Sequence, residues 1–512
     1  MNTMDLYDGI TALPDTLVLE AAQPSTRWRR WMRWGALAAA LALVVGGGAL
    51  ILPHLHMGAA QGNSTGGDGK AAVYMHYTGP VLPLTVRGDA AGITAERTVE
   101  FDFSPYRGET VTEAGETYEH FRSETGVTDR YVLTNTTDTD RTLTLLYPEA
   151  GDLRGTERGT AAVTVDGAAV DTTLYVGPAG AVGDGAEAEA MRRINFTGAV
   201  WDDYRTLLSG AAYQDAAFAP LPVLTQRVTV YRLDDYVLPE GDPGTGGAVY
   251  FSFDINYDRT AVFTFGSNGG SWDRENGRCS LLNGAIGTDG GRARPMYVIL
   301  LGDDIADYAV EGYYYGGGST PKPFAVTAAV ERREVTMDQV LTEIVAQSDE
   351  LRELLPAGDT ALTGEQQKGY ISDYLLRCGL LDGTDGFGRY DDGRLEDMFE
   401  AFVMGRVLYS AFEVTIPAGG SAEIVVSAVK EASYDYPGGG RNWNRHGYDM
   451  ATQLGSNLTF SGQRAAIRGT EYVTLLDSNF GFDPDGGVTE VALDTAQEHY
   501  WMQVARRVPE GS

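Results

Sequence analysis

The sequence predicts a mainly β protein: one N-terminal transmembrane helix, then Ig-like β-sandwich domains with an α-helical insertion. Three observations predict this class. Beyond residue 70 the chain consists largely of short strand-like runs, separated by turns rich in its 65 glycines. Before them lies one uncharged apolar stretch of the length that crosses a bilayer. Between residues 336 and 409 the apolar spacing changes from the period of a strand to that of a helix.

The apolar stretch at residues 34–53 is predicted to be the transmembrane helix. It reads WGALAAALALVVGGGALIL and ends at Pro53. Four arginines precede it and the first basic residue after it is Lys70, so the positive-inside rule places the N-terminus in the cytoplasm. A cleaved signal peptide is the alternative, although its apolar region is usually only about 7–15 residues long. The predicted anchor residues are the arginines and tryptophans of the flank: Arg27, Trp28, Arg29, Arg30, Trp31, Arg33 and Trp34.

These features divide the chain into segments of different character. In chain order they are a cytoplasmic tail (1–33), the transmembrane helix (34–53), a flexible stalk (54–70), a first β-sandwich domain (71–240), a second β-sandwich domain (241–335 together with 410–512) and, within the second, the helical insertion (336–409).

Turn chemistry supports the strands of the first domain. Residues 131–135 and 142–147 flank the polar turn TTDTDR, which predicts a β-hairpin. Asp166-Gly167 is a dipeptide that tolerates the positive φ angles of a tight primed turn, between short strands on either side. In the last block, residues 412–416 and 423–427 read as strands joined by a Pro-Ala-Gly-Gly turn.

Two capping signals mark helix starts within the insertion. Thr336 is followed three residues later by Gln339, and Thr363 by Gln366. In this pattern the Thr oxygen and the Gln side chain satisfy amides that the first helical turn leaves unpaired. We therefore expect helices to begin at both places.

The composition limits the classes of function. The formal net charge is −32, and the four arginines before Pro53 offset four acidic residues there, so the acidic excess lies beyond the anchor. Such a surface is well solvated and repels phosphate backbones, which excludes nucleic acid as a partner. Cys279 and Cys378 are the only cysteines, and the sequence leaves open whether they form a disulfide or remain free thiols.

No catalytic or cofactor-binding pattern stands out in the sequence. It contains neither a His-Glu-x-x-His metalloprotease motif nor a phosphate-binding loop. We therefore predict no enzymatic activity and no cofactor. The stretch DGTDGFGRYDDGRLED offers weak calcium candidates, although it lacks the twelve-residue ligand pattern of an EF-hand and ordinary polar turns are the alternative. These candidates are Asp382, Asp385, Asp391 and Asp392.

Aromatic side chains form the better lead to a ligand site. They cluster in the Gly-rich stretch YDYPGGGRNWNRHGYD, as Tyr434, Tyr436, Trp443 and Tyr448. Exposed rings on loops can stack on sugars or anchor a protein partner, because they offer a large contact area at low entropy cost. The alternative is that these rings cap the core of the sandwich.

Several phrases of the sequence resemble a group of uncharacterised single-pass membrane proteins of Gram-positive bacteria. They are DLYDGITALPDTLVLEAA, RWRRWMRWGALAAALALVV, YVLTNTTDTDRTLTLLYP, FEVTIPAGGSAEIVVS and YDMATQLGSNLTF. The short N-terminal cytoplasmic tail before a β-rich ectodomain is similar in layout to membrane-anchored anti-sigma regulators, although about 33 residues are too few for a sigma-binding domain of the usual kind. The resemblance implies a protein of the cell membrane with an extracytoplasmic C-terminal region.

The function we predict is that of a non-catalytic, membrane-anchored extracytoplasmic sensing or interaction protein, with a relay to a cytoplasmic regulator through the tail. Its expected partners are the lipid bilayer and, outside the cell, a protein or a cell-wall glycan. A cell-surface glycan- or protein-binding module is the first alternative. A cell-envelope hydrolase is the second, because the three-dimensional spacing of paired carboxylates cannot be read from sequence.

Overall fold

The structure is a computed structural model, and it describes most of the chain beyond the predicted stalk. The described residues are 76–507 except 114–115, 121–122, 154–160, 180–199, 238–246, 287–293, 315–321, 324–326, 349–361, 378, 382–392, 400–401, 403 and 436–443. The described part of the chain is mainly β, with 52% of its residues in strands and 15% in helices. The strands form two β-sandwiches, which we call the first and second sandwich.

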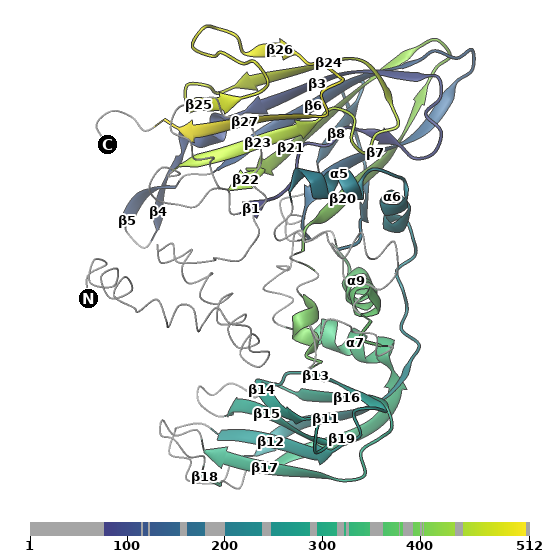
Figure 1. The fold of residues 1–512 in the computed structure, drawn as a ribbon, viewed down its shortest axis with the longest axis vertical. Helices are drawn as coiled ribbons and strands as arrows, with labels where there is room; N and C mark the ends of the chain where they lie inside the picture. Colours follow the sequence, from purple (N-terminus) through teal and green to yellow (C-terminus); the bar gives the residue numbers. More distant parts are fainter. Residues whose placement is uncertain are drawn as a thin grey trace. The chain divides into compact units, whose positions relative to one another are not determined.

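The first sandwich consists of two large sheets with an apolar core between them (Figure 1). One, the β6 sheet, has seven strands in the order β26 (Glu490–Ala492), β24 (Thr459–Arg468), β3 (Ile93–Asp102), β6 (Glu124–Asn135), β21 (Ser421–Glu431), β8 (Ala162–Val165) and β9 (Ala168–Val170). The other, the β7 sheet, has two parts: β1 (His76–Tyr77), β22 (Tyr434–Asp435), β23 (Arg445–Ala451), β27 (His499–Arg506) and β25 (Val473–Ser478); and β10 (Thr173–Val176), β20 (Arg406–Ile416), β7 (Arg141–Gly151) and β2 (Thr85–Val86).

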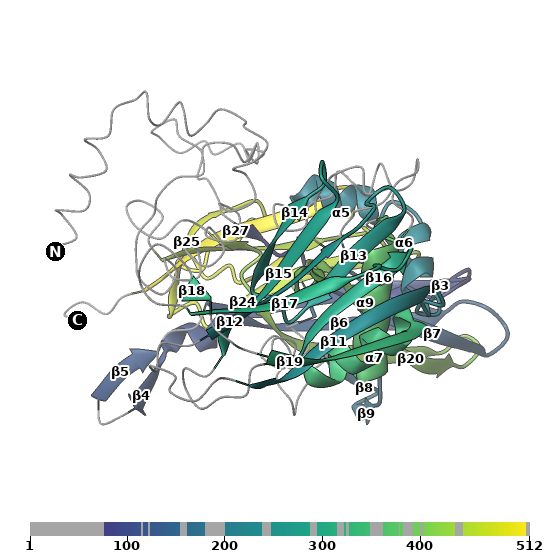
Figure 2. The same cartoon turned by 90° about the horizontal axis from the view of Figure 1, so that it is seen from below.

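Short elements join or flank these sheets. Val81 forms isolated bridges with Glu149 and Met450, which links the two parts of the β7 sheet. The 3-10 helix η1 (Ser104–Arg107) follows β3. Next comes the hairpin of β4 (Glu109–Glu113) and β5 (Glu116–His120), which projects from the sandwich (Figures 1 and 2).

The second sandwich spans residues 227–336 and has its own core. The β11 sheet has the order β13 (Thr260–Phe265), β16 (Met296–Gly302), β11 (Arg227–Val237) and β19 (Thr327–Thr336). It packs on the β12 sheet, of order β14 (Gly269–Asp273), β15 (Arg278–Ile286), β12 (Gly247–Asp254), β17 (Tyr308–Tyr314) and β18 (Lys322–Pro323). Alternate apolar residues of 249–255 and of 296–300 supply much of this core.

Helical elements cover the other face of the β11 sheet. They are α7 (Met337–Gln347), α9 (Gly364–Arg377) and the 3-10 helix η4 (Leu395–Phe399). Both predicted capping boxes are present: Thr336 Oγ1 accepts from Gln339 N at 3.3 Å, and Thr363 Oγ1 accepts from Gln366 N at 3.2 Å. The helical stretch predicted for residues 336–409 is therefore confirmed where the structure describes it, although β20 already begins at Arg406.

The partner of the last block differs from our expectation. We expected residues 410–512 to pack with 241–335, but β20 pairs with β7 along its whole length and β21 pairs with β6. The first sandwich is thus built from both ends of the described chain, and the second sandwich with its helices is the insertion. Alternation of apolar residues shows which face of a strand is buried, but it does not show which distant strand will pair with it.

The predicted hairpin around TTDTDR is also wrong. Both strands exist, but β6 and β7 lie in opposite sheets of the sandwich, so the turn carries the chain from one sheet to the other. The Pro-Ala-Gly-Gly turn crosses in the same way between β20 and β21, and the two crossings are hydrogen-bonded to each other. Asn135 Nδ2 donates to Ile416 O and Pro417 O, each at 3.1 Å, and Gly419 N donates to Thr137 O at 3.1 Å.

One predicted turn has the expected conformation. Asp166 and Gly167 have φ angles of 49° and 78°, as a primed turn requires, and they join β8 to β9. Cys279 is a free, buried thiol in β15, and Cys378 lies outside the described residues. Burial raises the pKa of the Cys279 thiol to about 12, so it carries no thiolate at neutral pH.

Candidate functional site

Two short helices cover the outer face of the β7 sheet. They are α5 (Trp201–Leu207) and α6 (Ala212–Ala217). Leu146 of β7 contacts this helical layer, whereas Leu145 next to it faces the core, because successive strand side chains point to opposite faces. The first turn of α5 is acidic, and Asp203 Oδ2 accepts a hydrogen bond from Val200 N at 3.1 Å, which satisfies an amide at the helix start.

Buried tyrosines fix these helices to the sheet. The Tyr204 hydroxyl donates to Thr78 O at 2.9 Å. The Tyr213 hydroxyl donates to Pro178 O at 2.9 Å and accepts from Val407 N at 3.0 Å. Since both rings are buried and both hydroxyls are paired, the helices are held in one position on the sheet.

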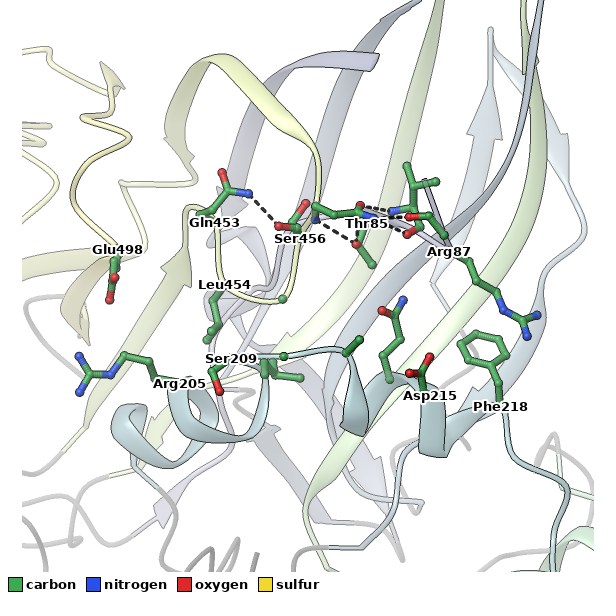
Figure 3. Close-up of a pocket in the computed structure, with 18 residues that line it drawn as sticks. Thr85, Arg87, Arg205, Ser209, Asp215, Phe218, Gln453, Leu454, Ser456 and Glu498 are labelled. Carbon is green, nitrogen blue, oxygen red and sulfur yellow. Dashed lines mark hydrogen bonds between the residues drawn. The ribbon is translucent and has the colours of Figure 1, made fainter. Parts of the chain in front are cut away.

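A pocket of about 550 Å³ lies where these helices meet the edge of the sheet (Figure 3). Its walls are β2 and the following residues to Gly88, the segment 205–218, the loop 453–457 and Glu498. This volume is within the range of small-ligand sites, roughly 300–1,000 Å³. The pocket is therefore large enough for a ligand of several linked units.

Asn457 holds the loop 453–457 against strand β2. Its Oδ1 accepts from Val86 N at 2.9 Å and from Thr85 Oγ1 at 3.0 Å. Its Nδ2 donates to Val86 O at 2.9 Å and to Gly88 O at 2.8 Å. The side chain thus occupies the free edge of β2 as a neighbouring strand would, and it fixes one wall of the pocket.

Charged groups lie at both ends of the pocket (Figure 3). Arg205 and Glu498 are at one end, and Arg87, Asp215 and Phe218 are at the other. The Arg87 guanidinium carbon lies 4.1 Å from the centre of the Phe218 ring, in a cation–π contact. Each end therefore offers both a positive and a negative group to a ligand.

An Asp–His pair lies next to the pocket. His499 Nε2 is 2.7 Å from Asp449 Oδ2, and the Tyr77 hydroxyl donates to the same oxygen at 2.6 Å. Although burial disfavours the charged carboxylate, the hydrogen bond with His499 lowers the pKa of Asp449. The imidazole stacks on Trp201 of α5, with ring centres 4.2 Å apart. Within the described part of the chain no hydroxyl or thiol is hydrogen-bonded to this imidazole.

The structure corrects part of the aromatic prediction. Tyr434 lies in β22 and Tyr448 in β23, and both side chains are buried. The Tyr448 hydroxyl is 2.7 Å from that of Tyr106, and the Tyr434 ring lies 4.6 Å from that of Tyr77. These two rings therefore belong to the core, in line with the alternative, because they lie on the strands β22 and β23. Tyr436 and Trp443 lie outside the described residues.

Other candidate residues fall outside the structure. The calcium candidates Asp382, Asp385, Asp391 and Asp392 all lie there, and so do the predicted anchor residues 27–34 and the apolar segment 34–53. Among the residues that are described, no three His, Cys, Asp or Glu side chains are placed to hold a metal ion. None of the helices in that part of the chain is both long and apolar enough to cross a membrane.

The pocket was not predicted from sequence, because α5 and α6 fall in a region that we assigned to strands. A signal for α5 is present: two acidic residues follow Val200, and Tyr204 and Leu207 are spaced three apart on the buried face. The lining residues come from four distant segments and form no local motif.

No model of a known protein family matches this chain, and the comparison with curated proteins finds no match.

Proposed function

We propose that this protein is a non-catalytic, membrane-anchored sensing or interaction protein whose extracytoplasmic ligand binds in the pocket at α5 and α6. The observation that carries the proposal is the pocket itself, which combines charged, amide, hydroxyl and aromatic groups on a rigid scaffold. The Ig-like character of the two sandwiches and the anchor at residues 34–53 are parts of the same proposal, supported by the strand pattern and the flanking arginines.

The chemistry of the pocket favours binding over catalysis. The residues that line it include no histidine and no cysteine. The neighbouring His499 is held between Asp449 and the Trp201 ring, without a hydroxyl or thiol that it could activate in the described residues. Arginine, carboxylate and amide groups around an aromatic ring are typical of recognition.

A sensing role requires a route across the membrane. In this proposal the tail at residues 1–33 contacts a cytoplasmic regulator, and the anchor connects it to the pocket-bearing domain. A surface module that only adheres to wall glycan or to another protein would use the same pocket but would need no partner for the tail.

The proposal is tested by the binding of the full chain, purified in detergent, to cell-wall material from Gram-positive bacteria. Phe218→Ala and Glu498→Gln change opposite ends of the pocket, and we expect each to weaken binding about tenfold, the effect of losing one charge-assisted or aromatic contact. Asp138→Asn is the matched control, because Asp138 is exposed on the loop between β6 and β7 and does not line the pocket.

Three results would contradict parts of the proposal. Binding that both pocket variants leave unchanged would exclude the pocket as the site. Release of soluble fragments from the wall material by the full chain would favour the hydrolase alternative. If the full chain captures no specific protein from a cytoplasmic extract by way of residues 1–33, the proposed relay to a cytoplasmic regulator is excluded.

A further inference from the structure

Three charged side chains at the two ends of the pocket have no charged partner in the described part of the protein. Neither the Asp215 nor the Glu498 carboxylate has a hydrogen bond or an ion pair with any described residue. The guanidinium of Arg87 lies over the Phe218 ring and has no hydrogen bond or ion pair with a described residue either. Arg205 is paired with Asp202 at 2.9 Å. One cation and two carboxylates are thus available to a ligand, distributed over both ends.

The middle of the pocket offers hydrogen-bonding groups. Gln214 Nε2 is buried and has no hydrogen-bond partner among the described residues. A buried donor without a partner is costly, and this atom is closed to solvent, so a ligand carbonyl would pair with it only when the Gln214 side chain turns toward the pocket. The space beside the glycines at 88 and 210 is open, since a Cβ at either position would meet no atom within 4 Å.

The aromatic ring in the pocket is already in contact with Arg87 and with the Tyr175 ring, whose centre is 4.3 Å away, so it offers little free surface to a sugar. Neutral glycans bind largely by placing the apolar face of a sugar ring on an exposed aromatic face. Here the Arg87 guanidinium occupies a face of Phe218, with its carbon 4.1 Å from the ring centre. This contact also fixes the guanidinium for bidentate bonding to a carboxylate.

We propose that the pocket binds a short peptide with free charged termini, whose carboxylate pairs with Arg87 and whose ammonium group pairs with Glu498 at the opposite end. This inference rests on the proposed function and adds the class of ligand. The peptide bonds of such a ligand supply carbonyl oxygens for Gln214 Nε2. A peptide of about four residues, at about 3.3–3.6 Å per extended residue, is of the size that the pocket can hold.

Calorimetric titration of the detergent-purified full chain with three probes tests this inference. The probes are tetra-alanine with free termini, N-acetyl-tetra-alanine amide, and the neutral sugar chitotetraose. We expect saturable binding of tetra-alanine, at least about tenfold weaker binding of the blocked peptide because it lacks both charges, and no binding of the sugar. Raising the salt concentration should weaken tetra-alanine binding, because the charged groups of the pocket are exposed.

Two variants locate the contacts. Arg87→Gln and Glu498→Gln, at opposite ends of the pocket, should each weaken tetra-alanine binding about tenfold and leave the affinity for the blocked peptide unchanged, since only the charged termini use these groups. Arg464→Gln is the matched control: Arg464 is an exposed arginine of β24 that pairs with Glu490 away from the pocket. Its variant should bind tetra-alanine as the unmodified chain does.

The outcomes separate this inference from the proposed function. Three outcomes would each overturn the peptide inference alone. The first is equal affinity for the free and the blocked peptide, and the second is tighter binding of chitotetraose than of tetra-alanine. The third is no binding of tetra-alanine while wall material still binds in a way that depends on the pocket. Wall binding that does not depend on the pocket would overturn the proposed function as well.

Discussion

The two sandwiches are built on different cores. In the first, a buried ion pair lies between the sheets: Arg97 Nε and Nη2 donate to the two carboxylate oxygens of Asp129 at 3.0 and 2.7 Å. The Tyr131 hydroxyl donates to the same carboxylate at 2.7 Å. In the second, the core cluster is apolar, and none of the charged residues described between 227 and 336 is buried.

The difference shows how each sandwich holds its sheets together. Arg97 extends from β3 of the β6 sheet, and its Nη1 donates to Ala451 O in the β7 sheet at 2.7 Å, so one guanidinium ties both sheets. Although burial disfavours the charged guanidinium, Asp129 holds the pKa of Arg97 above its usual value. The described part of the second sandwich has no buried ion pair between its sheets. A neutral hydrogen bond, from Asn283 Nδ2 in β15 to the Tyr236 hydroxyl in β11 at 2.9 Å, joins the sheets beside the apolar core. The first should therefore be more sensitive to the loss of one polar partner, and the second to the loss of packing volume.

The largest effect is expected from Asp129→Ala. It leaves the buried Arg97 charge uncompensated, which typically costs about 3–5 kcal/mol. Denaturant unfolding, followed by amide hydrogen exchange in peptides of each sandwich, should show the loss in the first sandwich only. The double variant Arg97→Leu/Asp129→Leu should cost less than Asp129→Ala, and a larger cost for the double variant would contradict the role of the pair.

Leu281→Ala tests the apolar core of the second sandwich. Leu281 is fully buried in β15, and truncation of a buried leucine costs about 2–5 kcal/mol, depending on how far the cavity collapses. Faster amide exchange should appear in β12 and β15 and not in β6. Leu476→Ala is the control, since that leucine is 40% exposed, and an equal effect of the two variants would argue against the assigned core.

A smaller, pH-dependent effect is expected from Glu149→Gln in the first sandwich. Burial raises the pKa of Glu149 from 4.5 to about 7. The folded state therefore binds the proton more tightly than the unfolded state, so this group lowers stability as pH rises from about 4.5 to 7, by at most about 3 kcal/mol. The variant should be more stable than the unmodified protein at pH 8 and nearly equal at pH 4. Parallel pH profiles of unfolding would show that Glu149 is not the group responsible.

The β class, the two capping boxes and the Asp166-Gly167 turn follow from the sequence alone, because each depends on residues within a few positions of one another. Alternation of apolar and polar residues marks the buried face of a strand. A Thr followed three residues later by a Gln allows each side chain to hydrogen-bond the backbone amide of the other at the start of a helix. These interactions form wherever the strand or helix lies in the fold.

Only the tertiary structure decided which strands pair and where the pocket lies. Asn135 and Asn457 look alike in sequence as the first residues of Asn-x-Thr sequons, yet each side chain is used to bond backbone groups of distant segments. The turn after Asn135 crosses between sheets because a second crossing, near Pro417, is hydrogen-bonded to it. The pocket depends in the same way on β2, α5, α6 and the loop at 453–457 meeting in space. Contacts between residues hundreds of positions apart leave no local pattern in the sequence, because the packing of the whole sandwich determines which of them form.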